Sequence, residues 1–271
     1  MQPTAPDDSG DRVRYVDCDT WIGRGVGNRN VGGVALSAAD LLSELDRLGV
    51  AGALTYHVLA KEYAPAVGNA AVLDEVSGQP RLSAIWAVMP DHTEEVPPSD
   101  RLPELMLSAG VRMARMFPAW SPQAHRFSLE EWCVGDLLRA LEAARMPLEC
   151  DFTLFRRGEP PWPDIYRICH LHPKLPVILM DIQGRNNRTL YALLKQCPNA
   201  HVQTSGLNVH HGLADFRRHF GPERLIFGSG YPIKTLGGAV LQVERSGLSD
   251  DDRRLVAAGN LERLVGQAAL R

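Results

Sequence analysis

Carboxylate and aromatic side chains recur at every second position in short apolar stretches of the sequence. VDCDTWIG carries Asp17, Asp19 and Trp21 in this spacing, and LECDFT carries Glu149 and Asp151. Because alternate residues of a strand point to one face, each set is predicted to share a face. Neighbouring carboxyl groups push each other's pKa values apart, which is the arrangement that general acid/base catalysis uses. A partly protonated pair with a purely structural role is the alternative.

Other apolar stretches also end in polar side chains. In VRMARMF, alternation places Arg115 on one face with Met113 and Phe117. Its guanidinium would offset the acids or hold a substrate carboxylate in bidentate fashion. The predicted catalytic residues are Asp19, Asp151, Asp181 and His57, and the predicted substrate-binding residues are Trp21, Arg115, Glu149, Gln183, Ser205 and Tyr231.

The elements that carry these residues alternate between strand and helix along the chain. Strand-like stretches are predicted at 14–23, 50–57, 81–90, 111–118, 147–153, 175–184, 200–206 and 224–232, with helical patterns between most of them. The core strands are near-continuous apolar runs, typical of parallel strands buried on both faces. We therefore expect an α/β fold, a (β/α)₈ TIM barrel in a single domain over residues 13–271, with a flexible tail at 1–12. An open doubly wound sheet is the alternative.

Composition excludes several classes of partner. The 271 residues carry a net charge of −3 and the pI is about 6.3, which gives no basic field for nucleic acid or an anionic membrane. No apolar run approaches the roughly 20 residues of a spanning helix, and the first residues do not resemble a secretory signal. The five cysteines are odd in number and lack a Cys-x-x-Cys pair, as expected for a reducing cytoplasm.

Several phrases of the sequence resemble a known family. GNAAVLDEV, MPLECDFT, KLPVILMDIQG, ERLIFGSGYP and LVAAGNLERLVG, in this order, are similar to the amidohydrolase superfamily. The likeness is to its amidohydrolase-related (amidohydrolase 2) branch of small barrels, which includes lactonases and decarboxylases. It extends from about residue 14 to 267.

The resemblance implies a metal site whose usual ligands are replaced in this sequence. Members typically have His-x-His on the first strand, where Asp19 and Trp21 stand here, and histidines at the positions of Asp151 and Asp181. The usual acid of the eighth strand is Gly230. We expect no cofactor, with the Trp21 indole filling the vacated volume. The alternative is a divalent metal (Mg²⁺, Mn²⁺, Ca²⁺ or Zn²⁺) held by the three aspartates.

The resemblance and the acid residues together favour a small-molecule enzyme. We expect a hydrolase of a lactone or amide, or a C–C lyase or decarboxylase, that acts on a small acidic or polyol substrate without the family's zinc. The alternative is a catalytically silent barrel that binds a ligand or partner. The retention of aspartate at three replaced positions favours the enzyme. The resemblance also implies a homodimer.

Overall fold

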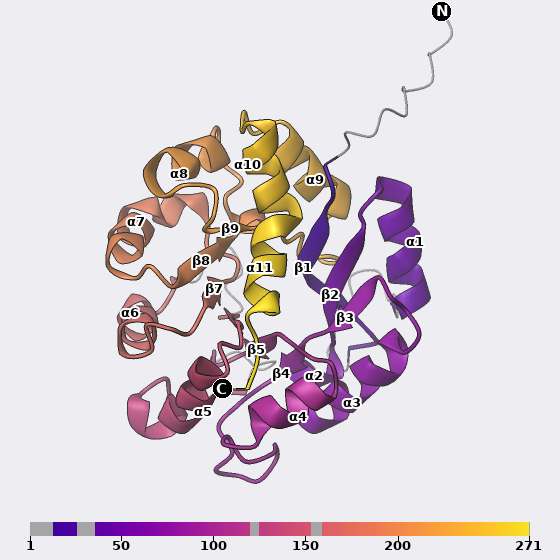
Figure 1. Ribbon diagram of the computed structural model, residues 1–271, viewed down its shortest axis with the longest axis vertical. Helices are drawn as coiled ribbons and strands as arrows, with labels where there is room; N and C mark the ends of the chain where they lie inside the picture. The colour runs from indigo at the N-terminus through magenta and orange to yellow at the C-terminus, as the bar shows by residue number, and fades with distance from the viewer. Residues whose placement is uncertain (1–12, 26–35, 120–124, 153–158, 271) are drawn as a thin grey trace, which may run out of the picture.

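Nine parallel strands form a closed barrel in the computed structural model, which describes residues 13–25, 36–119, 125–152 and 159–270 (Figure 1). The strands are β1 (Val16–Ile22), β2 (Gly52–His57), β3 (Leu82–Ala84), β4 (Trp86–Ala87), β5 (Ala114–Met116), β6 (Leu148–Cys150), β7 (Val177–Leu179), β8 (Ala200–Gln203) and β9 (Leu225–Ile226). Hydrogen-bonded neighbours follow the chain order within two sheets, β1 to β3 and β4 to β9. The predicted tail at 1–12 lies outside the described residues.

Two junctions join the sheets into a barrel. Between β9 and β1, the Cys18 amide donates to the Phe227 carbonyl at 3.0 Å, and the Gly230 amide donates to the Asp19 carbonyl at 3.0 Å. The predicted strand at 81–90 is interrupted at Ile85, where the hydrogen-bonding partner changes: the Ile85 amide donates to the Thr55 carbonyl of β2 at 2.8 Å, and the Trp86 amide donates to the Met113 carbonyl beside β5 at 3.2 Å. The interruption divides one predicted strand into β3 and β4, so the eight predicted β/α units remain and the predicted barrel is confirmed.

Helices surround the barrel (Figure 1). They are α1 (Ala38–Leu48), α2 (Leu59–Glu62), α3 (Pro65–Val76), α4 (Leu102–Ser108), α5 (Glu131–Ala143), α6 (Trp162–Leu171), α7 (Asn187–Gln196), α8 (Gly212–Phe220), α9 (Leu236–Glu244), α10 (Asp250–Arg254) and α11 (Asn260–Gly266). The predicted last helix, 249–266, contains a π-helical turn at Leu255–Gly259. Among the described residues no helix is long and apolar enough to cross a membrane.

Local sequence signals explain where α1 begins and ends. The Ser37 hydroxyl accepts from the Asp40 amide at 3.1 Å, and the Asp40 carboxylate accepts from the Ser37 amide at 2.9 Å. This capping box satisfies two amides that the first turn leaves unpaired. The helix ends at Gly49, whose φ of +67° belongs to the left-handed conformation that glycine adopts without penalty.

One end of the barrel is closed and the other holds the polar residues. Helices α10 and α11 lie across the barrel in Figure 1. Leu261 and Leu264 of α11 belong to the same apolar cluster as Val16, the first residue of β1. This helix therefore covers the amino-terminal ends of the strands. The carboxyl ends, where active sites of such barrels lie, remain on the opposite side.

Candidate active site

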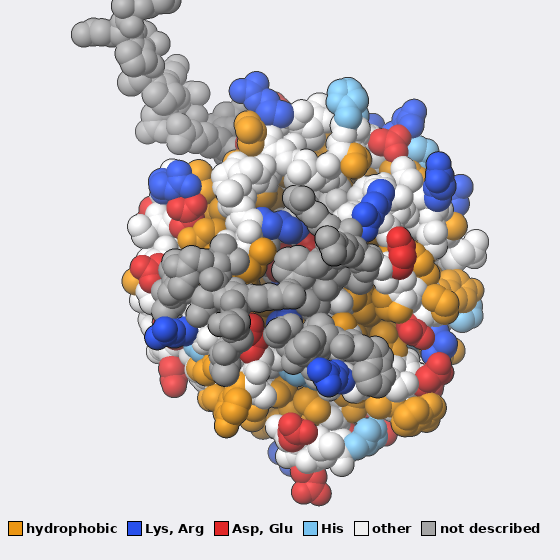
Figure 2. Space-filling model, turned by 180° about the vertical axis from the view of Figure 1, so that it is seen from behind, with side chains coloured by type: hydrophobic (Ala, Val, Ile, Leu, Met, Phe, Trp, Pro, Cys, Tyr) orange, Lys and Arg blue, Asp and Glu red, His pale blue; other side chains and the backbone are white. Residues whose placement is uncertain are grey.

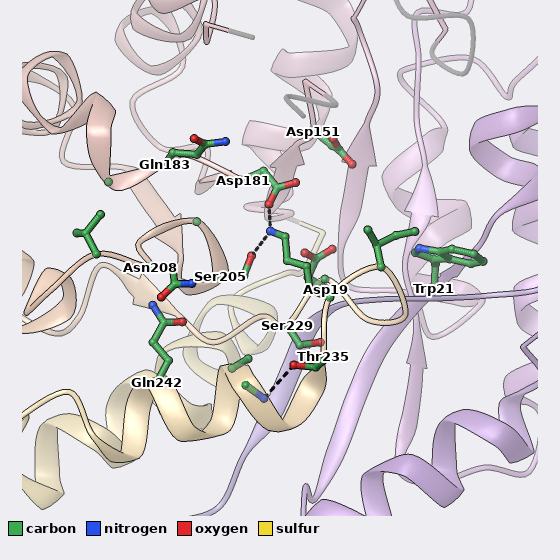
Figure 3. A pocket seen from close by; sticks show the side chains of 18 of the residues that line it. Asp19, Trp21, Asp151, Asp181, Gln183, Ser205, Asn208, Ser229, Thr235 and Gln242 are labelled. Carbon is green, nitrogen blue, oxygen red and sulfur yellow. Dashed lines mark hydrogen bonds and ion pairs between the residues drawn. The ribbon is translucent and has the colours of Figure 1, made fainter. Parts of the chain in front are cut away.

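A cavity of about 760 Å³ is located at the carboxyl ends of the strands. It brings together seven of the ten predicted site residues, namely Asp19, Trp21, Arg115, Asp151, Asp181, Gln183 and Ser205. Figure 3 shows Asp19, Asp151 and Asp181 directed toward a common region from different strand ends. Figure 2, taken from the side opposite Figure 1, shows basic and acidic side chains mixed over that face. The visible charges therefore do not form one basic field.

Arg115 lies between three carboxylates below the cavity. Its guanidinium donates to Asp19 Oδ1 at 2.7 Å, to Asp151 Oδ2 at 2.7 Å and to Glu149 Oε2 at 3.2 Å. The side chain is only 5% exposed, and its Cζ lies 4.7 Å from the centre of the Tyr56 ring. The alternation in VRMARMF correctly indicates that this residue points inward. The guanidinium is already committed to the chain's own acids.

Burial and charge act in opposite directions on this group. Burial by itself lowers the pKa of Arg115, but the carboxylates of Asp19, Asp151 and Glu149 raise it well above its usual value. Burial also raises the pKa of Glu149 to about 8, although Arg115 lowers it. Glu149 is fully buried, and no hydrogen bond to its Oε1 is present among the described residues. A protonated Glu149 therefore relieves repulsion between the acids.

We predict that Glu149→Gln removes a pH-dependent loss of stability. The folded state keeps the Glu149 proton up to about pH 8, whereas an unfolded glutamate releases it near 4.5. Folding therefore binds a proton between these values, and the wild-type free energy of unfolding falls as pH rises through this window, at most by about 1.4 kcal/mol per pH unit. Glutamine cannot ionise, so the free energies of unfolding of the wild type and Glu149→Gln should differ increasingly as pH rises above 5. Urea unfolding from pH 4.5 to 8.5 measures the difference, and parallel curves would contradict the prediction.

A second network joins Asp181 to the arginine cluster. Lys234 Nζ donates to the Asp181 carboxylate and, at 2.8 Å, to Ser205 Oγ. Ser205 Oγ donates to Gln203 Oε1 at 2.8 Å, and Gln203 Nε2 donates to Asp19 Oδ2 at 3.0 Å. Because Asp19 also binds Arg115, hydrogen bonds run without interruption from Asp181 to Asp151. Figure 3 draws the two bonds that meet at Lys234 Nζ.

Sequence reasoning missed several site residues, among them Lys61 and Gln203, and it missed or misjudged Lys234 and Gly230. Gly230 offers no ligand, but it has a φ of +74°, and a Cβ there would lie 3.1 Å from Lys234 Cδ. The lysine chain therefore passes close over this position, where a Cβ would be tightly packed and the positive φ favours glycine. The available signal was a lysine that follows the strand-end phrase FGSGYP by two residues.

Three predicted site residues do not line the cavity. His57 packs its ring against Gly23, its Nδ1 accepts from the Leu59 amide at 3.2 Å, and burial lowers its pKa. Tyr231 packs against the outer core, where the charges of Glu44 and Asp40 act on its hydroxyl. Glu149 lies beneath Arg115. His57 is the last residue of β2, as predicted, whereas Tyr231 lies beyond the end of β9 at Ile226, and neither side chain lines the cavity.

A bulge in β1 explains why Asp17 is also separated from the cavity. The pairing of β1 with β2 shifts between Asp17 and Thr20, so that two β1 residues face one residue of β2. This extra residue breaks the two-residue alternation. Asp19 and Trp21 line the cavity, whereas Asp17 is fully buried elsewhere. Its Oδ1 accepts from the amides of Asp19 and Ser229, and burial raises its pKa to about 7. It holds β1 to the β9 end.

Comparison with known proteins decides the family. The sequence matches the amidohydrolase family over residues 19–267. The chain belongs to the amidohydrolase family. The predicted resemblance is therefore confirmed over nearly the whole chain. No curated protein matches the sequence significantly.

Solved structures of the same fold include enzymes of two reaction types. A 5-carboxyvanillate decarboxylase from Sphingomonas paucimobilis has a TM-score of 0.70 at 15% identity, covering 94% of this chain and 99% of that chain. A putative 2-pyrone-4,6-dicarboxylic acid hydrolase from Pseudomonas putida has a TM-score of 0.68 at 18% identity, covering 94% and 98%. At these identities the likeness establishes the barrel architecture.

A third structure corrects the expectation of a site with no cofactor. A dihydroxybenzoic acid decarboxylase from Polaromonas sp. JS666 has a TM-score of 0.70 at 14% identity, covering 94% of this chain and 97% of that chain. It contains bound manganese and the inhibitor 2-nitroresorcinol. The fold therefore accommodates a metal ion, and the expectation of no cofactor was wrong.

The described side chains in their present arrangement do not fit such an ion. Within residues 13–25, 36–119, 125–152 and 159–270, no group of three His, Cys, Asp or Glu side chains is placed to hold one. The oxygen ligands that the sequence suggested are each paired with a cation: Asp19 and Asp151 with Arg115, and Asp181 with Lys234.

Proposed function

We propose that this protein is an enzyme that hydrolyses or decarboxylates a small carboxylate-bearing molecule in the cavity at the barrel mouth. The observation that carries the proposal is the meeting of Asp19, Asp151 and Asp181 with Lys61, Arg115 and Lys234 on the wall of one cavity. The cations suit an anionic substrate, and the acids suit proton transfer. Membership of the amidohydrolase family supports the same class of reaction.

Asp181 is the group best suited to donate a proton. Burial raises the pKa of its carboxyl, while the neighbouring Lys234 lowers it and the charges of Asp19 and Asp151 raise it. Its side chain is 37% exposed, so a ligand in the cavity can reach it. Asp151 accepts a hydrogen bond from Arg115 at 2.7 Å and forms an ion pair with Lys61 at 3.8 Å. Carboxyl groups in such unlike environments divide the acid and base roles between them.

Asp181 is the proton donor in both reactions. In decarboxylation the electron pair of the breaking C–C bond remains on the substrate carbon, and Asp181 supplies the proton that replaces CO₂. In hydrolysis the Asp151 carboxylate takes a proton from a water molecule while the oxygen of that water attacks the carbonyl carbon of the substrate. Asp181 then protonates the leaving oxygen or nitrogen. The Trp21 indole and Ile233 form an apolar wall beside these groups.

A paired assay tests the proposal. Purified protein is incubated with a panel of aromatic hydroxy acids and β-keto acids, with release of CO₂ measured, and with a panel of carboxylated lactones, with release of acid titrated. Turnover of one panel that Asp151→Asn abolishes identifies the reaction. If neither panel is turned over and Asp151→Asn raises the free energy of unfolding, the barrel is a ligand- or partner-binding protein and the proposal fails.

A further inference from the structure

Lys234 reaches the cavity from the segment between β9 and α9. Its side chain is 38% exposed, and its ammonium bonds to Asp181 and Ser205. An ammonium has three donors. Among the described residues these bonds use two of them, which leaves one for a ligand in the cavity.

The other cations of the cavity are less suited to hold a substrate anion. Arg115 is 5% exposed and already bonded to three carboxylates, so a ligand would have to displace one of them. Lys61 is 15% exposed, lies 3.8 Å from Asp151 and stands over the Phe117 ring at 5.0 Å. Arg185 is exposed on a 3₁₀ turn, where water weakens an ion pair. Lys234 is accessible from the cavity, and its bonds to Asp181 and Ser205 hold its ammonium in place.

Gly230 determines the path of the Lys234 chain. A Cβ on Gly230 would lie 3.1 Å from Lys234 Cδ and 3.5 Å from Asp19 Oδ2. A side chain at this position would therefore press on the lysine arm, which would have to shift by a few tenths of an ångström. The φ of +74° independently favours glycine. Gly230 and Lys234 thus act as a unit in which the glycine leaves the space that the lysine crosses.

We propose that the Lys234 ammonium is the group that binds the carboxylate of the substrate, and that Gly230 is the residue that positions it. This proposal rests on the proposed function, because it presumes an acidic ligand in the cavity. It assigns the substrate carboxylate to the space bounded by Asp19, Asp181 and Ser205. It also replaces the sequence-based choice of Arg115 as anchor.

Binding of an acid and of its neutral amide tests this proposal. The probes are 2,6-dihydroxybenzoate and 2,6-dihydroxybenzamide, measured by titration calorimetry on the wild type, Lys234→Met, Gly230→Ala and Lys195→Met. Loss of a charged hydrogen bond should weaken binding of the acid by about 10- to 100-fold in Lys234→Met. Gly230→Ala should also weaken binding of the acid, although the lysine is still present. Amide binding should stay unchanged, and Lys195→Met, which removes an exposed lysine of α7, should match the wild type.

The outcomes separate this inference from the proposed function. If the wild type binds the acid and Lys234→Met binds it equally well, Lys234 is not the anion-binding group and the proposed function stands. Equal loss of acid and amide binding in Lys234→Met would mean that the lysine only shapes the cavity, which also overturns the inference. If the wild type binds neither this acid nor any member of the carboxylate panel, the proposed function fails and the inference fails with it.

Discussion

Arg115→Met is expected to lower the free energy of unfolding by about 3–5 kcal/mol, because removing one partner of a buried ion pair leaves its counter-charges uncompensated. Methionine keeps much of the apolar volume of the arginine stem, so the effect reports mainly on charge. Asp19 and Asp151 would then lose their closest hydrogen-bond donor while remaining 8% exposed. Urea unfolding followed by circular dichroism at pH 7 measures the change.

A matched surface arginine provides the control for Arg115→Met. Arg139 also pairs with two acids, Glu131 and Asp136, but its side chain is 56% exposed. Because exposed ion pairs contribute about 0–1 kcal/mol, Arg139→Met should change stability only slightly. If both variants lose the same stability, the three-carboxylate cluster does not depend on Arg115.

The architecture was predictable because it depends on patterns that are local in the sequence. Strand runs such as LPVILMDIQG are apolar on both faces, as parallel barrel strands require, and helix signals such as the Ser37–Asp40 box lie within one turn. The division of 81–90 at Ile85 was not predictable from these patterns. It depends on a change of hydrogen-bonding partner between two adjacent residues, because the Ile85 amide donates to Thr55 of β2 and the Trp86 amide donates to Met113, which precedes β5.

Site residues were predictable where strand alternation holds and not where it breaks. Arg115 and Asp151 follow the alternation of their strands and reach the arginine cluster as expected. Asp17 does not share the face of Asp19 because a bulge inserts a residue between them, and a bulge has no signature in VDCDTWIG. His57 occupies the predicted strand end, but close approach of the Gly23 backbone holds its ring outside the cavity.

Lys234 shows why loop residues escape such reasoning. Its contribution depends on the three-dimensional path of its side chain over Gly230, and Lys234 itself belongs to no predicted strand or helix. A glycine in place of an expected acid was read as the loss of a function. In the structure the same glycine makes space for a cation that bonds to Asp181. With glycine in place of the acid, this strand end therefore contributes the positive charge of Lys234 to the cavity and no negative charge of its own.

Asp181→Asn is expected to reduce kcat by about 10²- to 10⁴-fold, the usual contribution of a general acid, on whichever panel substrate the wild type turns over. Asparagine keeps the shape and can still accept from Lys234, but it has no acidic proton to give. Stability should change little because the carboxylate is 37% exposed. KM should also change little if Lys234 rather than Asp181 holds the substrate.

The pH profile distinguishes proton donation by Asp181 from a structural role. Burial and the charges of Asp19 and Asp151 raise the pKa of Asp181, with Lys234 opposing them. Because the acid form is the active one, kcat should fall as pH rises through this raised pKa, and the residual rate of Asp181→Asn should lack that limb. Asp251→Asn, at an exposed acid of α10, should keep both the rate and the profile. An Asp181→Asn protein that retains the limb with a lowered kcat would place the donated proton on another group, of which Asp19 is the nearest carboxyl along the same hydrogen-bonded network.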